Sequence, residues 1–409
     1  NNLTSLDLSQ NISLKKLTCP KNQLTDLDLS NNVLLDTLDC GKNQLNSLDV
    51  SQNTSLKWLS CFNTFASNIN NNTLDLSNNP LLEYVFCEWN HISSLNVNGA
   101  ISLKELYCAH NFNITSLDLS QNTALEVLDC TENELSSLDV SQNPNLERLL
   151  SSENQLTALD VTSNTALNEL IVYYNQLSSL DVSQNTALTN LGFAANQIAN
   201  IDVSQNTALT HLSLASNPIT HIDVSQNTGL VSFWAWDSDL TELDLSNNPA
   251  LRELNVSGNN LNCLNLKNGN NINMTDINRV EMRGNFNLFC IEVDNPAWAQ
   301  INWHTVVSPQ VSFSTNCVNA CNSVGIEEDN EQELGFSSFP NPFSEQLRLE
   351  FDKHSNYEIK IFDLVGKELM TMNVIGSGHI LSTSHLPAGV YIVQTKSEDR
   401  MGTHKLIKK

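Results

Sequence analysis

Basic residues are scarce in this sequence. It has 20 Lys and Arg against 45 Asp and Glu, which gives a formal net charge of −25. The deficit lies in the first 333 residues, with 11 basic and 37 acidic residues, whereas residues 334–409 have 9 and 8. Nucleic-acid binding requires clustered Lys and Arg to neutralise phosphates. The acidic body therefore argues against a nucleic-acid partner and is typical of a soluble extracellular surface.

Long apolar runs and catalytic motifs are also missing. No run is long enough to cross a bilayer, and there is no nucleophile elbow, HExxH, P-loop or GxGxxG motif. The nine His residues are scattered, and for Trp303-His304 a structural role is the simpler interpretation. The Gly-rich calcium-binding repeat is absent as well. The sequence thus predicts a protein that is not an enzyme and uses neither a cofactor nor a metal ion.

The chain has no initiator Met and no signal peptide, and it begins within a repeat at Asn1-Asn2-Leu3. A solenoid needs a polar cap over its first repeat, so we expect a mature form or a fragment. The missing signal peptide is therefore no argument against export.

A short apolar motif recurs along most of the chain. A Leu-Asp-Leu/Val core, or a close variant, occurs thirteen times with a step of 21 residues, broken by a step of 26 before Leu74 and one of 22 before Leu117. The cores start at Leu6, Leu27, Leu48, Leu74, Leu95, Leu117, Leu138, Leu159, Leu180, Ile201, Ile222, Leu243 and Leu264. This period predicts stacked coils that share one core and present faces rather than a pocket.

Each repeat has two similar halves. Residues 14–24 read Leu-x-x-Leu-x-Cys-x-x-Asn-x-Leu, and residues 24–32 read Leu-x-x-Leu-x-Leu-x-x-Asn. The pattern closely resembles the bacterial leucine-rich repeat in which Cys replaces one Leu, as in internalin J-like repeats. In Leu-x-Leu, alternation places both apolar residues on one face, and the turn Asn can hydrogen-bond the backbone along the stack.

The resemblance implies an α/β-type solenoid that is mostly β. We expect a leucine-rich repeat slab at residues 1–266, a C-terminal cap at 267–321, an acidic linker at 322–335 and a small Ig-like β-sandwich at 336–409.

Ten cysteines form two groups. Six share one apolar position of the first half-repeat: Cys19, Cys40, Cys61, Cys87, Cys108 and Cys130. Later repeats place Val, Leu or Phe there, which favours a ladder of buried thiols over a metal site. Equivalent residues of in-register strands lie about 4.8 Å apart with parallel Cβ vectors, which disfavours disulfides along the ladder.

The other four cysteines, Cys263, Cys290, Cys317 and Cys321, lie where the repeat ends. A secreted protein can staple such a cap with disulfides. Similar leucine-rich repeat caps imply a Cys290–Cys317 bridge, whereas Cys263 and Cys321 can pair or stay free. A four-Cys zinc site is the alternative, although no close CxxC pair supports it.

The sequence pattern changes after Leu334. Residues 347–351, 359–361 and 390–392 alternate as short strands, with turns at 363–366 and 387–389, which predicts a small β-sandwich.

This segment closely resembles the C-terminal sorting domain of type IX secretion cargo. The matching residues are Phe-Pro-Asn-Pro-Phe at 339–343, 361–367, 386–393 and the basic end at 405–409. The resemblance implies export through the periplasm by the type IX machinery, which would read residues 336–409. The protein would then lie outside the cell or on the outer-membrane surface. An ordinary Ig-like binding module is the alternative.

Carboxylates recur at one outward position of the repeat. They are Asp7, Asp28, Asp49, Asp75, Asp118, Asp139, Asp160, Asp181, Asp202, Asp223 and Asp244, with Asn96 and Asn265 completing the row. Like charges about 5 Å apart repel by roughly 0.8 kcal/mol per pair in water. We expect hydrogen bonds from the following Ser or from turn amides to offset this repulsion; a cation-binding stripe is the alternative.

Aromatic residues form only 6% of the chain, yet they gather in outward positions of the first-half strand and its turn. These residues, with one His, are Trp58, Phe62, Tyr84, Phe86, Trp89, Tyr107, His110, Tyr173, Tyr174, Trp234 and Trp236. Most other repeats have small or polar residues there, so strand propensity alone does not explain the clusters. Contiguous exposed aromatics mark contact sites. The irregular stretch 63–73 is expected to form a rim loop beside the first cluster.

We therefore predict an adhesin-like, non-catalytic binding protein that recognises a protein or a glycan on the concave face of the repeats. A protein would dock on the aromatic anchors. A glycan would stack on the rings while Glu88, Glu105 and Asp129 accept hydrogen bonds from its hydroxyls. The alternatives are the accessory part of an extracellular enzyme whose catalytic module lies outside this sequence, or a self-associating surface structural protein.

Overall fold

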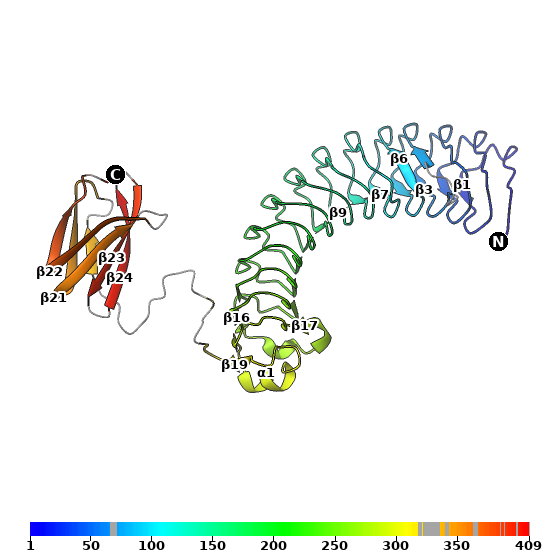
Figure 1. Ribbon diagram of the computed structural model, residues 1–409. Coiled ribbons are helices and arrows are strands. Elements are labelled where there is room, and N and C mark those ends of the chain that lie inside the picture. The colour runs from blue at the N-terminus through cyan, green and yellow to red at the C-terminus, as the bar shows by residue number, and fades with distance from the viewer. Residues whose placement is uncertain are drawn as a thin grey trace. The chain divides into compact units, whose positions relative to one another are not determined.

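The computed structural model of the chain has two compact units, Asn1–Cys321 and Asn322–Lys409 (Figure 1). The structure describes residues 1–65, 72–317, 321, 336–339, 343–362, 367–384, 386–387, 389–397 and 400–408. The acidic segment 322–335 and residues 66–71 of the irregular stretch lie outside the described residues. Among the described residues, no helix is long and apolar enough to cross a membrane.

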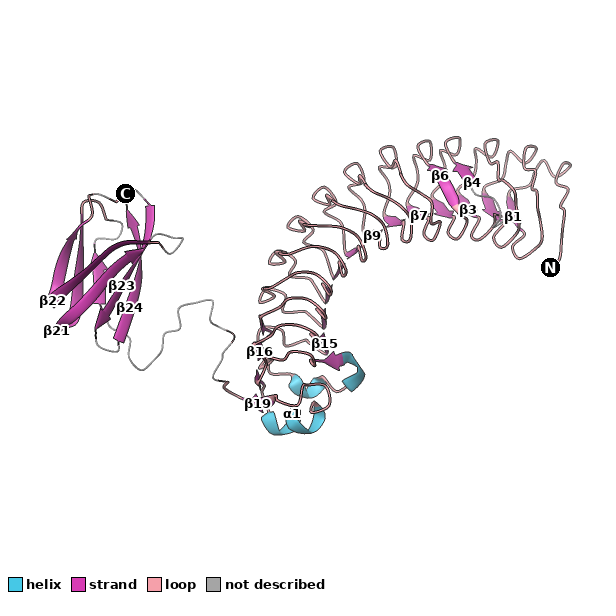
Figure 2. Ribbon diagram, viewed as in Figure 1, coloured by secondary structure: helices cyan, strands magenta, loops and turns pink. Residues whose placement is uncertain are grey.

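The first unit is a curved solenoid in which each repeat makes one coil (Figure 1). Thirteen short parallel strands line its concave side, which Figure 2 shows as magenta segments linked by long loops. They are β1 (Lys16–Thr18), β2 (Thr37–Asp39), β3 (Trp58–Ser60), β5 (Tyr84–Phe86), β7 (Glu105–Tyr107), β8 (Val127–Asp129), β9 (Arg148–Leu150), β10 (Glu169–Ile171), β11 (Asn190–Gly192), β12 (His211–Ser213), β13 (Ser232–Trp234), β15 (Glu253–Asn255) and β17 (Val280–Glu281). The expected solenoid, mostly β, is thus confirmed.

The convex side has two smaller parallel sheets. One pairs β4 (Asn72–Asp75) with β6 (Ile92–Asn96). The other runs β14–β16–β18–β19, with strands Glu242–Asp244, Cys263–Asn265, Cys290–Glu292 and Ser312–Ser314. Parallel stacking therefore continues beyond Leu266. The C-terminal end also has the short helices η1 (Asn271–Asn273), η2 (Ile277–Arg279) and α1 (Pro296–Asn302).

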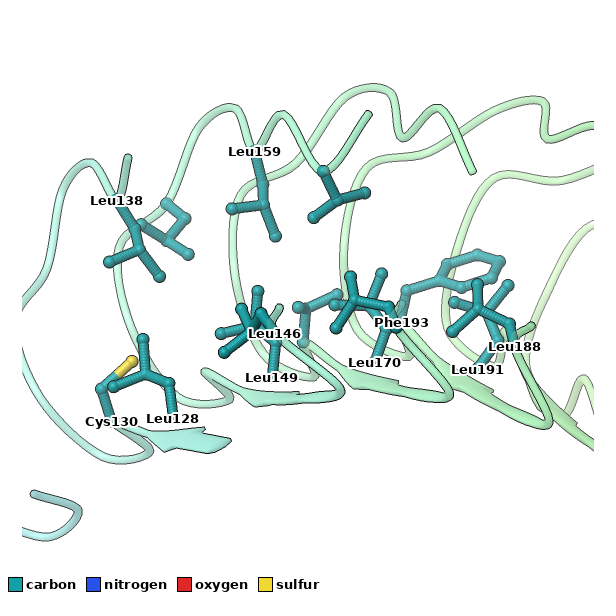
Figure 3. Close-up of a cluster of buried hydrophobic side chains, with 14 of the residues drawn as sticks. Leu128, Cys130, Leu138, Leu146, Leu149, Leu159, Leu170, Leu188, Leu191 and Phe193 are labelled. Atoms are coloured by element: carbon teal, nitrogen blue, oxygen red, sulfur yellow. The ribbon is translucent and has the colours of Figure 1, made fainter. Parts of the chain in front are cut away.

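The core is a column of apolar side chains inside the coils. The middle residue of each concave strand points inward, and Figure 3 shows Leu149, Leu170 and Leu191 facing the inside of the coil from successive strands. The six repeat cysteines are buried and unpaired in the same column, where Phe193 takes the equivalent position (Figure 3). The prediction of a packed thiol ladder is confirmed.

Buried Asn residues bind neighbouring coils to each other. Asn196 is representative: its Nδ2 donates to Val172 O at 3.0 Å and Phe193 O at 2.9 Å, and its Oδ1 accepts from Leu177 N at 3.0 Å. The Asn expected at the turns therefore satisfies backbone groups of its own coil and the preceding one. In a second row, at the next turn, Asn206 Nδ2 donates to Val182 O and Asn185 O, both in the preceding coil.

Two disulfides close the end of the solenoid. Cys290–Cys317 is the pair implied by the resemblance to other caps, and Cys263–Cys321 joins the two cysteines whose pairing the sequence left open. The zinc alternative is therefore wrong, because all four sulfurs are in disulfides. Trp303 is buried against this end, and its Nε1 donates to Met274 O at 3.3 Å.

The second unit is a five-stranded antiparallel sheet with its own core. Its strands are β20 (Phe336–Phe339), β21 (Gln346–Phe362), β22 (Glu368–Ser382), β23 (Gly389–Ser397) and β24 (Arg400–Lys408). The prediction that residues 347–351 and 359–361 form separate strands was wrong. Both lie in β21, because a register shift between Glu350 and Ser355 lets one strand continue past the irregularity. Residues 340–342 and the expected turn 363–366 lie outside the described residues.

Candidate ligand-binding face

The concave sheet brings residues of successive repeats side by side. In each three-residue strand the first and third side chains face away from the core, and parallel pairing aligns equivalent positions about 4.8 Å apart. Trp58 therefore pairs with Tyr84, and Phe86 pairs with Tyr107. Side chains more than 20 residues apart in the sequence thus form continuous rows on this face.

The first row of rings crosses strands β3, β5 and β7. The Trp58 and Phe86 centroids are 5.6 Å apart with planes tilted by 45°, and Phe86 stacks on Tyr107 at 5.0 Å with planes 8° apart. Burial raises the pKa of Tyr107, and the neighbouring Glu105, which shares a hydrogen bond with it, acts in the same direction. We call Trp58, Phe86 and Tyr107 the central row.

The second row lies on the turns that follow strands β5 and β7. The Trp89 indole stacks on the His110 imidazole at 4.1 Å, and Phe112 meets the Trp89 ring edge-on at 6.0 Å. Trp89 and Phe112 are 44% and 38% exposed, so this row offers large apolar surface to solvent. We call Trp89, His110 and Phe112 the rim row. The ring contacts of the described residues thus divide the predicted first cluster into two rows.

Phe112 and its neighbour His91, whose ring centroid lies 5.9 Å away, were missed from the sequence. A signal was present. Both residues follow the turn Asn, at a position where five other repeats have Gln. An aromatic ring there departs from a polar pattern in the same way as the rings that were identified.

Glu88 lies in the chain between the central and rim rows. It is half-buried, and its Oε2 is shielded from solvent with no hydrogen-bond partner among the described residues. Burial raises the pKa of Glu88; Asp129 acts in the same direction, whereas His110 opposes it. Since a shielded polar atom without a partner is costly, Glu88 is an unsatisfied acceptor beside the two rows. Asp129, by contrast, already accepts from Thr131 N at 3.1 Å.

Two further predicted residues have basic neighbours. The Lys42 ammonium lies 5.2 Å from the centroid of the Phe62 ring. Tyr84 and Trp58 line a cavity of ≈ 520 Å³ together with Lys16 and Lys57. The remaining lining residues are Thr18, Thr37, Asp39 and Glu83. These lysines were not predicted, because only their position beside the rings distinguishes them from ordinary surface lysines.

The second predicted cluster is only partly assembled. Tyr173 and Trp234 line a cavity of ≈ 300 Å³ on the concave face. Tyr174 is 58% exposed and, among the described residues, does not line this cavity. Trp236 is half-buried and also lies outside the lining. The structure therefore brings together two of the four residues.

On the convex side, the repeated Asp residues cap turns. In Asp28, Asp139 and Asp202 an Oδ1 accepts the backbone N–H of the Ser two residues later, at 2.8–2.9 Å. The Ser side chain and backbone N–H together lower the pKa of each of the three Asp residues; the side chain is the larger cause for Asp28 and the backbone for Asp139 and Asp202. Asn265 makes the equivalent bond to Lys267 N at 3.0 Å. Among the described residues, no group of three or more His, Cys, Asp or Glu is placed to hold a metal ion. The hydrogen bonds support the structural interpretation of this row.

Comparison with known proteins agrees with both units. The family model described as the secretion system C-terminal sorting domain matches residues 337–409. The functional domain of InlJ from Listeria monocytogenes, which includes a cysteine ladder, is 27% identical with a TM-score of 0.62, over 98% of this chain and 87% of that one. An internalin, InlF, from L. monocytogenes str. 4b F2365 is 19% identical with a TM-score of 0.57, over 76% and 89%. No curated protein sequence matches the chain.

The chain is therefore a leucine-rich repeat protein with a cysteine ladder similar to that of InlJ and with a C-terminal sorting domain. The sorting domain directs it by type IX secretion to the cell surface or the extracellular space, which confirms the predicted localisation.

Proposed function

We propose that this protein is a non-catalytic binding protein of the cell surface that holds a protein or glycan ligand on its concave face. The observation that carries the proposal is the pair of aromatic rows on the concave face. The type IX sorting domain places this face outside the cell, where such ligands are found.

The energetics of recognition support this use of the rows. Aromatic side chains dominate binding energy at interfaces because they bury large areas with few rotatable bonds. Trp89 and Phe112 are far more exposed than core aromatics such as Phe193 and Phe233. A ligand that covers them would remove apolar surface from water at about 25 cal/mol per Å². The stacked central row offers a flat surface beside them.

The chemistry of the face also favours binding. Its ordered groups are the stacked ring faces and the His110 imidazole, whose Nδ1 lies 2.9 Å from Glu132 Oε2. A ligand can be held by ring contacts, with no bond broken.

The test is binding of the full chain to an array of host proteins and oligosaccharides. We expect the double variant Trp89→Ala/Tyr107→Ala to lose the ligand that the wild type retains. Phe289→Ala is the matched control, because Phe289 is a highly exposed aromatic residue of the C-terminal end. Unchanged binding by the double variant would discard the assigned face. Self-association through the rows predicts instead that light scattering shows oligomers of the wild type and monomers of the double variant.

A further inference from the structure

We propose that the cavity between Tyr173 and Trp234 is a separate site for a neutral saccharide. This inference rests on the proposed function, and it assigns a ligand class to a second part of the concave face. The cavity is ≈ 300 Å³, at the small end of ligand pockets, which are about 300–1,000 Å³. The lining also includes Asn190, Ser213 and Ser232.

One wall is the Tyr173 ring, which lies over Gly192. A Cβ built on Gly192 would lie 2.4 Å from Tyr173 Oη and 2.5 Å from Cε1, so the ring occupies the space that any side chain at position 192 would need. Burial raises the pKa of Tyr173, and the nearby Ser213 hydroxyl opposes this shift. The Tyr173 backbone N–H donates to Ser152 Oγ at 3.0 Å. Because Gly192 has no side chain, the Tyr173 ring can lie across it.

The opposite wall is Trp234, which is 42% exposed. Gly192 pairs with Ser213 and Ser213 with Trp234, so the three residues form one row across β11, β12 and β13. The Tyr173 ring leans across Gly192 toward Ser213, and Trp234 stands on the next strand, so the two rings border the cavity over β12. Ser213 is a small residue, which leaves space between them. A sugar ring can lie against both aromatic side chains.

The neighbouring row of the same strands supplies polar groups. Asn190 Nδ2 donates to Glu169 Oε1 at 2.9 Å, so the Asn190 carbonyl oxygen remains as an acceptor. Ser232 is buried, and its Oγ donates to Glu253 Oε2 at 3.2 Å, which holds that carboxylate at the cavity. The Asn190 amide oxygen and the Glu253 carboxylate can accept hydrogen bonds from sugar hydroxyls.

The charges of the lining favour a neutral ligand. Glu253 forms an ion pair with Arg279, so this pair adds no net charge to the cavity, and the other basic residue of the lining is His211. The surrounding body of the first 333 residues is strongly acidic, with 37 acidic against 11 basic residues. This field repels sulfated and uronic-acid sugars. Neutral saccharides are unaffected by it.

The same lining disfavours an apolar side chain of a protein partner. Such a side chain would cover the carboxylate and amide groups without replacing their hydrogen bonds to water, which costs roughly 1–3 kcal/mol for each unsatisfied group. A saccharide has C–H faces that lie on the Tyr173 and Trp234 rings and hydroxyls that bond to these groups. Among these two classes, the saccharide alone satisfies both kinds of surface.

The test uses the full chain on an array of neutral and anionic oligosaccharides, with three single variants. Trp234→Ala removes one wall, and Gly192→Val displaces the Tyr173 ring without removing it. Tyr174→Ala is the matched control, since it removes an adjacent exposed ring that does not line the cavity. We expect the first two to weaken binding of a neutral oligosaccharide at least about tenfold. Tyr174→Ala should bind like the wild type, with all variants folded by circular dichroism.

The double variant Trp89→Ala/Tyr107→Ala separates this inference from the proposed function. We expect it to keep saccharide binding at the cavity while losing the ligand of the two rows. Saccharide binding that is lost in the double variant but kept in Trp234→Ala and Gly192→Val would overturn the cavity assignment and support the rows. An array on which no neutral oligosaccharide binds, or on which only anionic ones do, would also overturn it. If Trp234→Ala instead loses binding to a protein, the cavity holds a part of that protein and the saccharide assignment is wrong.

Discussion

Trp89 and His110 stack their rings at 4.1 Å although both residues have left-handed backbones, with φ of 60° and 54°. The same turn position is left-handed throughout the solenoid, and Gly258 and Gly284 occupy it near the C-terminal end. An L side chain in this conformation costs roughly 1–2 kcal/mol relative to the right-handed one. Other coils place Lys, Glu, Ala, Ser or Asp at this position, so the solenoid sustains this cost at most of its turns.

Tyr174 provides a direct test of that cost. It has φ of 51° and is 58% exposed, so its side chain contributes little packing to offset the backbone. We expect Tyr174→Asn to raise the free energy of unfolding by roughly 0.5–1 kcal/mol, because Asn tolerates the left-handed region. Urea denaturation followed by circular dichroism measures the change. Gln176→Asn, at an exposed position of the same turn, is the control, and a loss of stability in Tyr174→Asn would contradict the argument.

The Asn ladder gives a prediction of opposite sign. Asn196→Ala removes the partner of Leu177 N and of Val172 O, both in the preceding coil. We expect a loss of about 2–4 kcal/mol, because each unsatisfied buried group costs about 1–3 kcal/mol. The exposed neighbour Gln197 gives the matched control, Gln197→Ala, with a change within about 0.5 kcal/mol. Equal unfolding free energies for the two variants would show that water replaces the ladder bonds.

Much of the solenoid could be predicted because its physics repeats. The Leu positions determine which residues face inward, and the 21-residue step fixes the parallel register that pairs Leu170 with Leu191. The ladder position of Cys130 could be read from Phe193, which occupies the same apolar space later in the chain (Figure 3). Since register places equivalent residues side by side, the pairing of Phe86 with Tyr107 also followed from spacing alone.

The details of the site depend on side-chain directions, which the repeat does not determine. Nothing in the spacing places the Tyr173 ring over Gly192, because that requires the ring to lean across to the next strand. The same holds for Glu88, whose Oε2 is shielded from solvent. For Tyr174 the spacing predicts an outward position, but it does not predict that the residue lies outside the lining of the cavity that includes Tyr173.

The thiols of the ladder should not react with alkylating reagents in the folded protein. Burial raises the pKa of Cys19 to about 11 and raises that of Cys61 further. Because the thiolate is the reactive form, we expect iodoacetamide at pH 8 to leave all six repeat cysteines essentially unlabelled in the native protein. Cys19 should be the first to react, since it is slightly exposed whereas Cys40 is fully buried. Peptide mass spectrometry measures the order in which the cysteines are alkylated. Rapid labelling of Cys40 in the native protein would refute burial of the ladder.

Glu88 should make stability depend on pH. Its pKa in the folded protein is raised above the ordinary 4.5, mainly by burial, so the folded state favours the protonated carboxyl. Its stabilising contribution is complete below pH 4.5 and is lost as the pH rises through the higher folded value. We expect Glu88→Gln to have a higher Tm than the wild type at pH 7.5, with the difference vanishing near pH 4. Glu153→Gln, at an exposed position, controls for net charge; a lower Tm for Glu88→Gln at pH 7.5 would be the contrary result.

The convex Asp row should show the opposite dependence and no response to calcium. The hydrogen bonds from Ser204 lower the pKa of Asp202 in the folded protein, so its contribution is present above about pH 3.8 and is lost as the pH falls through the lower folded value. We expect Asp202→Ala to lower Tm at pH 7 and to converge on the wild type near pH 2. Asp202→Asn should retain most of the stability at pH 7, because Asn96 and Asn265 accept the equivalent bond. We expect millimolar Ca²⁺ to leave the Tm of both proteins unchanged, because the carboxylates already accept hydrogen bonds from their turns. If the row bound cations, Ca²⁺ would raise the Tm of the wild type more than that of Asp202→Asn.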